Sequence, residues 1–537
     1  MISLRRALTA GVLGAALALT ACSSTSTGTG AGTGAAAGSD ATFVVGMGAE
    51  PPHLIRLFLG DVHVGLVGLA MEESLVTVTR KGDIEPLLAE SWDQPDEKTY
   101  VFHLRSGVKW HDGKDFTADD VVFTMTEGLG VTSQTAALKK LIASVTADNP
   151  QTVTVKLAQP AGGFLAMLNP MAFSILPKHI YEGSDMENNP ANRAPIGTGP
   201  FKFGSWENNR ITLVRNDDYW GDKPAYKNVV FTVIGDANAR TLALKNGDID
   251  YINSYDVPFE AIRQFDGDNK VTLDIGRASV SMKMLPFNTR NPILSTPQVR
   301  RALFQAIDRE FISSTVFGGY FPPATSALPE NHWANSGEVD YTKDLPFDAD
   351  AAGKALDAAG YPKKADGTRF TLTYRYMASE PGGAKVAEVV ADNWKAIGVN
   401  TKIVQDDTEV FRKEVFADHK FDTYTINISS GADPAIGLYR RYTCDNGANA
   451  VFGNATNYCN KELDQVFVQA NGANDRAERT KLYTDASKII ERDLPTANLV
   501  QVKYTEAISS DEQNIEGFFR LGEVVLLDWS KIAPPKS

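Results

Sequence analysis

The alternation of apolar and polar positions near the start of the chain predicts a small unit that contains both a strand and a helix. Residues 99–104 alternate with a period of two, as in a half-buried strand, and residues 119–125 have the spacing of a first helical turn. Thr117 is placed to cap that helix, with Asp119 and Asp120 in its positive first turn. We therefore interpret the two aspartates as capping residues.

Further along the chain, apolar positions recur with either the strand period or the helix period. Strands are expected at residues 41–48, 153–157, 202–206, 211–215, 280–285, 371–374, 400–404 and 421–428. Helices are expected at 62–78 (running into a short strand), 164–168, 241–245, 298–311 and 386–397. The last helix lies between two strands, an order that predicts a parallel pair whose ligand-facing edge is at the strand ends. Trp394 on this helix is interpreted as a core residue.

Residues 1–21 have the features of an export signal peptide. A pair of arginines precedes an apolar run that is too short to span a bilayer. The small residues before Cys22 resemble the lipobox of bacterial lipoproteins, which implies that this cysteine is lipidated and begins the mature chain. An ordinary signal peptide with an incidental cysteine is the alternative. Apart from Cys22 and a final aspartate, residues 22–40 are only Ser, Thr, Gly and Ala, so we expect a flexible tether.

Composition sets the size class and excludes one kind of partner. The chain has 537 residues, 43% of them hydrophobic and 22% charged, which is typical of a soluble globular protein with two or three domains. Its formal net charge is −13 and its pI is about 5.2. Because binding to nucleic-acid phosphates needs a basic patch, nucleic acid is not expected as a partner.

Several short motifs follow one another in an order that resembles a known family. They lie at residues 86–92, 102–105, 108–110, 112–113, 118–121, 197–201, 215–216, 219–220, 287–289, 300–302 and 307–309. With these motifs the chain after residue 40 resembles the extracellular solute-binding proteins of ABC importers, in the large family that binds peptides and nickel. The resemblance implies an α/β fold with two lobes, similar to periplasmic binding proteins of type II, with mixed sheets and a small extra domain inserted in the first lobe.

The same resemblance suggests how the chain is divided. The first lobe is expected to comprise residues 41–60, 193–277 and 508–537. Residues 61–192 would form the inserted small domain, and residues 278–507 the second lobe. The chain would then cross between the lobes twice.

The resemblance also places the candidate ligand site in a cleft between the lobes. In peptide-binding members, an acid three residues before an Asp-Pro pair holds the amino terminus of the peptide. If Asp433 belongs to the matching pair, Ser430 occupies the position of that acid. A neutral hydroxyl cannot replace a charge-assisted bond to an ammonium group, so binding of free-amine peptides is weakened unless Asp433 or Glu50 serves instead. Glu50 is a candidate because some members use an acid at the end of the first strand.

Residues around this segment complete the predicted site. Asn427, Ser429 and Gly431 belong to the same stretch of chain as Ser430. Arg440 and Arg441 are candidates for holding a substrate carboxylate, with a solvated helix face as the alternative. Tyr424 offers a stacking surface, with the same alternative.

The three cysteines fit an exported protein. Lipidation of Cys22 would leave Cys444 and Cys459 as an even pair outside the cytoplasm, and we predict a disulfide between them. A metal site is the alternative, although no second cysteine pair or closely spaced histidine supplies further ligands.

Catalytic motifs are missing from the sequence. It contains no Gly-x-Ser-x-Gly and no His-Glu-x-x-His, and its seven histidines are scattered. We therefore do not expect an enzyme, and we expect neither a cofactor nor a bound metal.

The function implied by the resemblance is capture and delivery of a solute. The chain would be a monomer, lipid-anchored to the outer face of the cell membrane, that closes on a small peptide or peptide-like solute and passes it to an ABC permease with ATPase subunits. Nickel or a metal chelate, an opine and a sugar are alternative solutes. A solute sensor built on the same fold is the alternative function.

Overall fold

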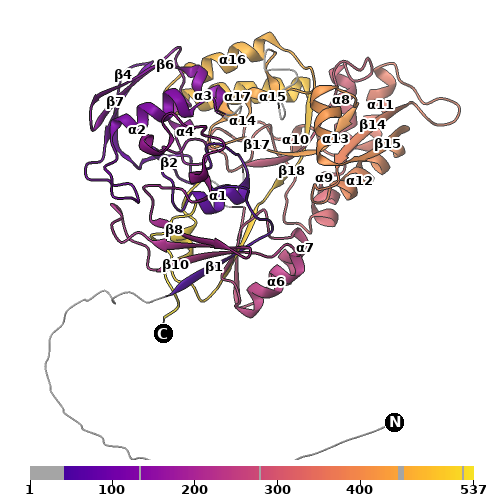
Figure 1. Ribbon diagram of the computed structural model, residues 1–537. Coiled ribbons are helices and arrows are strands. Elements are labelled where there is room, and N and C mark those ends of the chain that lie inside the picture. Colours follow the sequence, from indigo (N-terminus) through magenta and orange to yellow (C-terminus); the bar gives the residue numbers. More distant parts are fainter. Residues whose placement is uncertain (1–40, 132–134, 277–279, 445–452, 523–524, 537) are drawn as a thin grey trace, which may run out of the picture. The chain divides into compact units, whose positions relative to one another are not determined.

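A seven-stranded mixed sheet is the frame of the first lobe in the computed structural model, which describes residues 41–131, 135–276, 280–444, 453–522 and 525–536 (Figure 1). The strand order is β12-β19-β11-β1-β10-β9-β8. The strands are β1 (Thr42–Met47), β8 (Phe201–Glu207), β9 (Arg210–Arg215), β10 (Asn228–Val233), β11 (Tyr251–Ile252), β12 (Val271–Ile275) and β19 (Thr505–Ser509). β1 is parallel to β10 and β11, whereas the other pairs are antiparallel.

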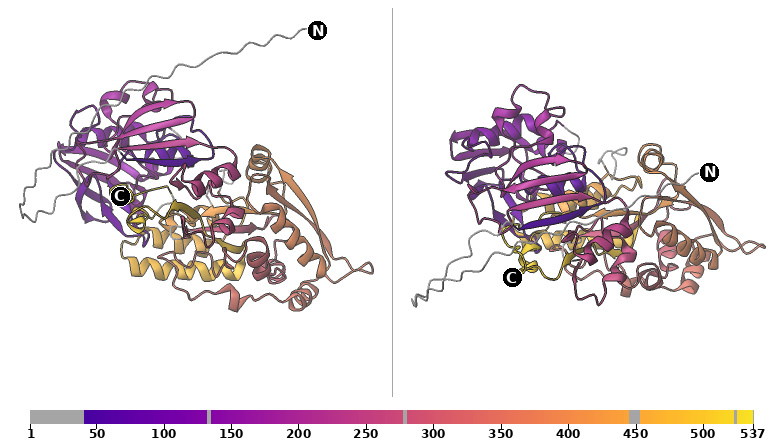
Figure 2. Two further views of the ribbon diagram at one scale, coloured as in Figure 1. Left: turned by 90° about the horizontal axis from the view of Figure 1, so that it is seen from below. Right: turned by 60° about the horizontal axis from the view of Figure 1, so that its bottom comes forward.

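Both faces of this sheet are covered, as the alternation along β1 requires. Phe43 and Val45 are buried in one apolar core together with residues of α1 (Val62–Gly68) and α18 (Ile515–Phe518). Val44 packs into a second core on the opposite face with residues of α6 (Ala237–Asn246) and α7 (Phe259–Phe265). Successive side chains of a strand point to opposite faces, so a strand with apolar residues in sequence is suited to this central place. Figure 2 shows the broad face of the sheet.

A second, antiparallel sheet lies in the segment that we expect to form the inserted domain. Its order is β4-β5-β7-β6, and a two-stranded β2-β3 ribbon lies beside it in sequence. The strands are β2 (Val76–Val78), β3 (Ile84–Pro86), β4 (Ala89–Asp96), β5 (Thr99–Leu104), β6 (Ile142–Asn149) and β7 (Thr152–Leu157). The helical elements are α2 (Ala118–Phe123), a π turn (Thr124–Gly128), α3 (Ala136–Leu141), α4 (Phe164–Met167), α5 (Lys178–Tyr181) and a 3₁₀ turn (Pro190–Arg193). Their apolar side chains share one core.

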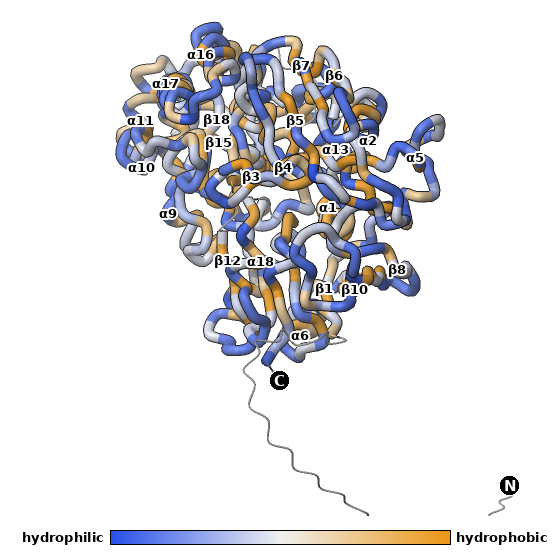
Figure 3. The backbone as a smooth tube through the Cα atoms, turned by 90° about the vertical axis from the view of Figure 1, so that its left-hand side faces the viewer, coloured by the Kyte–Doolittle hydropathy of each residue, from blue (hydrophilic) through white to orange (hydrophobic). Residues whose placement is uncertain are grey.

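Two three-stranded sheets organise the second lobe. The first has the order β17-β13-β18 and is antiparallel, and the second has the order β15-β14-β16 and is parallel. The strands are β13 (Ser281–Pro286), β14 (Phe370–Met377), β15 (Val399–Asp406), β16 (Thr423–Tyr424), β17 (Ile426–Ser429) and β18 (Thr496–Val502). The helices are α8 (Pro297–Gln305), α9 (Arg309–Phe311), α10 (Tyr341–Asp344), α11 (Ala349–Ala358), α12 (Gly383–Ala396), α13 (Thr408–Arg412), α14 (Pro434–Gly437), α15 (Tyr439–Tyr442), α16 (Lys461–Gly472) and α17 (Arg476–Asp493), with π turns at Ile312–Val316 and Lys413–Ala417. Hydrophilic positions interrupt the hydrophobic stretches along this chain (Figure 3).

Several expected elements are confirmed. Strand β5 has the predicted bounds, and the amide of Thr117 donates to the carboxylate of Asp120 over 3.0 Å, in the capping role foreseen for that aspartate. β14 and β15 are parallel and joined through α12, and Trp394 on this helix is fully buried.

Two expected elements are wrong in extent. The single helix expected at 298–311 ends at Gln305, and a new start at α9 follows because Asp308 caps the amide of Phe311 over 2.8 Å. The single strand expected at 421–428 is two short strands, β16 and β17, which pair with different sheets.

The expected boundary at residue 61 can be compared with the apolar core to which each neighbouring segment contributes side chains. Residues 55–58 contribute apolar side chains to the core of the inserted domain, whereas residues 66–71 return to the core of the seven-stranded sheet. The chain therefore passes between the two cores on both sides of residue 61. The chain passes from the seven-stranded sheet to the β17-β13-β18 sheet between β12 and β13 and returns between β18 and β19, and we call these two passages the crossovers. Among the described residues, none of the helices combines the length and apolar character needed to cross a membrane.

Candidate functional site

Two neighbouring cavities, which we call cavity A and cavity B, lie where the two lobes meet. Cavity A has a volume of about 340 Å³ and is lined from the first lobe by Arg56 and Asp61 and from the second lobe by Ser281. Cavity B has a volume of about 650 Å³. Ser429, Tyr255 and Tyr504 line both cavities. A solute in this space would therefore contact residues of both lobes.

An aromatic pair forms part of the wall that the cavities share. The ring centroids of Tyr255 and Tyr504 are 4.9 Å apart, with an angle of 32° between the ring planes. Tyr255 follows β11 of the first lobe and is 53% exposed, and Tyr504 lies in the crossover between β18 and β19. The pair offers an apolar surface directly beside a crossover strand.

The end of β17 brings the predicted serine segment to these cavities. Asn427 lines cavity B, and Ser429 lines both cavities. The hydroxyl oxygen of Ser429 accepts a hydrogen bond from the amide of Gly431 over 3.0 Å, which turns the chain at the strand end. Ser430 is fully buried, and its amide donates to the carbonyl of Val280 over 2.7 Å.

Asp433 is committed to a bond inside the second lobe. Each of its carboxylate oxygens accepts a hydrogen bond of 2.7 Å from the guanidinium of Arg479. One of the same oxygens also accepts from the amide of Ala435 at the start of α14, over 2.9 Å. Asp433 is 4% exposed, so these bonds leave little of its carboxylate open to a solute.

Of the predicted arginine pair, Arg441 is buried and Arg440 is half-buried, and neither is paired with an acid among the described residues. Arg441 is 5% exposed and donates to the hydroxyl of Ser430 over 3.3 Å and to the sulfur of Met284 over 3.1 Å. Burial lowers the pKa of Arg441 to about 10 and also lowers the pKa of Arg440. The Nε atoms of both arginines are buried without a hydrogen-bond partner, and no acid within the described ranges is paired with either. Neither arginine lines cavity A or B.

Glu50 and Tyr424 lie elsewhere. Glu50 is exposed and accepts a hydrogen bond of 2.6 Å from the indole of Trp206, on which the guanidinium of Arg193 stacks at 3.7 Å. Tyr424 is 2% exposed and belongs to a core of aromatic and aliphatic side chains, where its ring packs edge-on against Phe421. The structure brings neither residue to the two cavities.

A histidine that the sequence analysis did not foresee lies between two carboxylates, of which Asp61 lines cavity A and Asp256 lines cavity B. The Nε2 atom of His63 lies 3.1 Å from a carboxylate oxygen of Asp256, and Asp61 caps the same helix, α1. Burial alone would lower the pKa of His63, but hydrogen bonds to Asp256 and Asp61 raise it to about 9. The sequence could have indicated that Asp61 is an N-cap residue, but no pattern in it links His63 to Asp256, which is 193 positions away.

A buried ion pair, which the sequence analysis also missed, borders cavity B. The ammonium of Lys283 on β13 lies 2.7 Å from one carboxylate oxygen of Glu380, and both side chains are almost fully buried. Glu380 lines cavity B and follows β14. Lys283 lies in a strand whose other residues are mostly apolar, and Glu380 lies in a loop. The local sequence pattern therefore does not predict that the two side chains form an ion pair.

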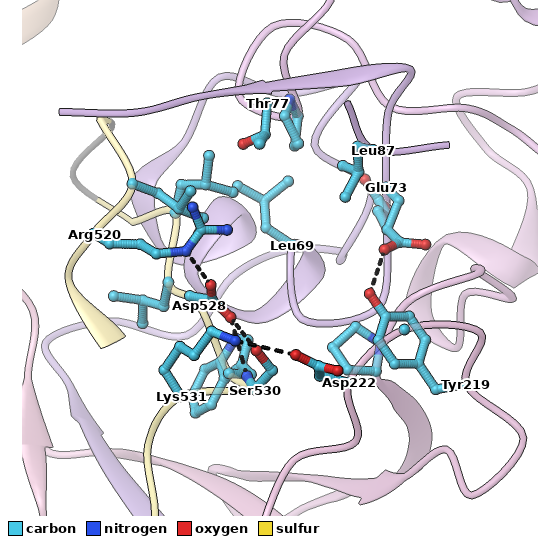
Figure 4. Close-up of a pocket in the computed structure, with 18 of the residues that line it drawn as sticks. Leu69, Glu73, Thr77, Leu87, Tyr219, Asp222, Arg520, Asp528, Ser530 and Lys531 are labelled. Atoms are coloured by element: carbon cyan, nitrogen blue, oxygen red, sulfur yellow. Dashed lines mark hydrogen bonds and ion pairs between the residues drawn. The ribbon is translucent and has the colours of Figure 1, made fainter. Parts of the chain in front are cut away.

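A third cavity, cavity C, is a polar space in which several charged side chains are paired with one another (Figure 4). It has a volume of about 340 Å³ and lies where the inserted domain meets the end of the chain. Glu73 accepts from the hydroxyl of Tyr219 over 2.7 Å, and burial raises the pKa of Glu73 to about 7. Arg520 is paired with Asp528 inside the same cavity. These bonds hold the cavity wall together.

The cysteines and possible metal ligands can be placed in part. Cys444 and Cys459 are joined by a disulfide that closes a separation of 15 residues. Cys22, with the signal peptide and the tether, lies outside the described residues. Within the described residues, no three His, Cys, Asp or Glu side chains gather in a way that could hold a metal ion.

Comparison with known proteins agrees with this architecture. The sequence model of the bacterial extracellular solute-binding proteins, family 5, matches residues 83–449. Heme-binding protein A of Haemophilus influenzae is 30% identical over 440 residues, which cover 77% of this chain and 78% of that protein. Oligopeptide-binding protein AppA of Bacillus subtilis is 30% identical over 494 residues, 88% of each chain. The structure of AppA in complex with a nonapeptide covers 92% of this chain and 99% of its own, with a TM-score of 0.76 and 27% identity. The predicted fold, two-lobed and α/β with mixed sheets, is confirmed.

Proposed function

This chain belongs to the bacterial extracellular solute-binding proteins of family 5, and from that premise we propose that it captures a small peptide or peptide-like solute for an ABC importer. Two similar proteins support the peptide class: the oligopeptide-binding protein AppA, whose structure contains a nonapeptide, and a dipeptide-binding protein of Escherichia coli, 28% identical over 448 residues. The solute would be bound without chemical change, in keeping with a family of solute-binding proteins.

The observation that carries the proposal is the shared wall of cavities A and B. Tyr255 belongs to the first lobe, Ser429 to the second, and Tyr504 to a crossover between them. A solute that contacts all three gains contacts only when the lobes are together, so binding shifts the population towards the closed state. A micromolar solute supplies about 8 kcal/mol, enough to bias a hinge whose states differ by a few.

The chain would work at the outer face of the cell membrane. We propose that residues 1–21 direct export, that Cys22 is lipidated, and that residues 23–40 tether the two lobes to the membrane. Two acyl chains give stable anchoring, because each buried methylene contributes about 0.8 kcal/mol. The closed protein would then be recognised by a permease with ATPase subunits, and the binding protein itself would act as a monomer.

The charged side chains around Ser430 indicate which end of a peptide this segment could hold. Asp433 is paired with Arg479, and Glu50 is bonded to Trp206. Beside Ser430 lies the guanidinium of Arg441, which is the wrong charge for holding an ammonium group. We propose that the solute is not anchored by a free amino terminus there. Although neither arginine lines cavity A or B, the positive charge of Arg440 and Arg441 makes this part of the lobe more favourable for an anionic group such as a carboxylate than for a cationic one.

The same observation favours a second candidate, a non-peptide solute carrying an anionic group. The relative named heme-binding protein A is as similar to this chain as the relative named for oligopeptides. Metal chelates, opines and sugars belong to the same alternative, and so does a solute sensor built on the same fold.

Native mass spectrometry of protein purified without denaturation tests the proposal. A carried solute should appear as a mass shift, and fragmentation identifies it as a peptide or as another compound. Isothermal titration with a peptide library then gives affinities. An empty protein with no response to any peptide would contradict peptide capture, whereas turnover of peptide or ester substrates that a point change removes would contradict a pure binding role.

A further inference from the structure

Three residues that line cavity B each carry a buried polar atom without a hydrogen-bond partner among the described residues. The atoms are Oε2 of Glu380, Oδ1 of Asn427 and Oγ of Ser254. Glu380 and Ser254 are each 8% exposed. A buried polar atom without a partner costs about 1–3 kcal/mol, so native proteins rarely leave several in one place. Such a group of atoms beside an open space indicates that something else supplies the missing bonds.

The three atoms come from separate parts of the fold. Ser254 follows β11 in the first lobe, Glu380 lies between β14 and α12, and Asn427 is on β17 in the second lobe. A ligand that bonds to all three therefore links the lobes. Two of the three atoms, the carboxylate and amide oxygens, can only accept hydrogen bonds, and the ligand must donate to them.

The remaining wall of cavity B is largely apolar. Its apolar side chains are those of Ala237, Val257, Pro258, Phe259, Ile262, Phe321, Met377, Pro381 and Val502. The ring centroids of Phe259 and Phe321 are 6.0 Å apart, and both rings belong to this wall. A ligand portion in cavity B should therefore be apolar over most of its surface, because burial of apolar area is the main source of affinity here.

The charge around cavity B disfavours a cation. Arg240 and Lys503 line the cavity together with Asp256 and Glu380, which makes two cationic and two acidic side chains. Directly behind Glu380 lies Lys283, fully buried and 2.7 Å from the other carboxylate oxygen. An added ammonium group would thus meet no net negative charge, while losing its hydration. A neutral N–H or O–H donor can bond to the same oxygens without that loss.

We propose that cavity B is the subsite for an apolar group that carries a neutral N–H donor, of the kind represented by an indole, and that this subsite selects the solutes of the protein. The N–H would bond to one of the three acceptors, and polar groups elsewhere on the same solute would bond to the others. The inference rests on the proposed function, because the group would be part of the captured solute. It adds a substrate class that the family alone does not give: solutes with a bulky apolar side chain and a neutral donor, in preference to solutes with a cationic one.

The test compares the binding of three tripeptides to the full-length protein by isothermal titration. Ala-Trp-Ala should bind about five- to tenfold more tightly than the same peptide methylated on the indole nitrogen, the size expected for one neutral hydrogen bond. Ala-Lys-Ala should bind more weakly than both. Equal affinities for the three peptides would overturn the proposal.

Two variants and a control locate the effect. Asn427→Leu and Ser254→Ala each remove one acceptor atom beside cavity B, and the variant that lacks the partner of the indole N–H should show a reduced preference for the unmethylated peptide. Thr401→Val is the matched control, because its hydroxyl is also buried and unpaired but does not line cavity B. Melting temperatures establish that each variant is folded. Unchanged discrimination in both folded variants would overturn the assignment.

A probe without a peptide backbone separates this proposal from the proposed function. Saturation-transfer NMR with free indole should show contact with the wild-type protein and with Thr401→Val, and less contact with Asn427→Leu. Indole binding without binding of any tripeptide would contradict peptide capture and support the subsite. Tripeptide binding without indole contact and without discrimination would contradict the subsite and support peptide capture.

Discussion

At the scale of the residue, a carboxylate in a candidate site can either bind the solute or stabilise the fold. The hydrogen bonds of Asp433 show that it stabilises the fold. Both of its oxygens are bonded to Arg479, which is itself 5% exposed. Burial would lower the pKa of Arg479, but its hydrogen bonds to Asp433 raise that pKa above its ordinary value. The pair therefore carries two charges in a place where neither could remain alone.

Substitution of Asp433 by Asn should lower the free energy of unfolding by about 3–5 kcal/mol, because Arg479 would keep a buried charge with no acid. Urea denaturation followed by circular dichroism measures the loss. Glu462→Gln is a suitable control, since Glu462 forms an exposed pair with Arg492 that is worth less than about 1 kcal/mol. A variant at Asp433 with normal stability and no solute binding would instead place this residue in the binding site.

At the scale of secondary structure, the sequence predicted what depends on local periodicity and missed what depends on distant partners. Strand β5 and the β14-α12-β15 unit could be predicted because each has an uninterrupted pattern and a clear turn. The break between β16 and β17 could not, because it arises where Thr425 donates to the carbonyl of Arg375 and the chain leaves one sheet for another. Ser429 was identified from the motif, whereas Glu380 has no pattern that indicates its place in cavity B.

The N-terminus of α1 is stabilised by interactions between His63 and two carboxylates, and His63 titrates within a pH range in which the protein can be studied. His63 stands in the first turn, where the helix dipole disfavours a cation, yet it lies between Asp61 and Asp256. Burial alone would lower the pKa of His63, and the hydrogen bonds to the two carboxylates raise it to about 9, above the value of about 6.5 for an unfolded chain. The hydrogen bond to His63 lowers the pKa of Asp61 to about 2.

The contribution of His63 to stability should therefore be fully present below pH 6.5 and lost as the pH rises towards 9. Melting temperatures of the wild-type protein should fall over this interval. His63→Asn should melt at a lower temperature below pH 6.5 and show a smaller fall with pH, because the titrating group is gone. Parallel curves for the two proteins between pH 6 and 9.5 would contradict this account of α1.

At the scale of the whole molecule, the inserted domain and the second lobe touch at a corner between α16 and α17. The guanidinium of Arg476 donates to the carboxylate of Asp83 and to the carbonyl of Lys81, each over 2.6 Å. Nearby, the amide of Gly162 donates to the carbonyl of Asn471 over 2.5 Å. These contacts join segments more than 300 residues apart, so they form only when the second lobe lies against the inserted domain.

Gly162 makes this corner a sensitive place to disturb closure. A Cβ atom added at Gly162 would lie 2.0 Å from the carbonyl oxygen of Ala473, and this oxygen belongs to the backbone and cannot rotate away. Gly162→Ala should thus push the two surfaces apart and disfavour the closed state by about 1–3 kcal/mol, the usual cost of overpacking. Solute affinity should fall by about tenfold, since about 1.4 kcal/mol of the binding energy would be spent on closure.

Gly472→Ala is the matched control for this corner, because a Cβ at Gly472 at the end of α16 meets no atom within 4 Å. Small-angle X-ray scattering with saturating solute should give a larger radius of gyration for Gly162→Ala than for Gly472→Ala and the wild-type protein. Titration calorimetry should show the loss of affinity in Gly162→Ala alone. Equal affinity and equal dimensions for all three proteins would mean that capture does not require this contact, and closure would then have to depend on the residues around Tyr255 and Tyr504.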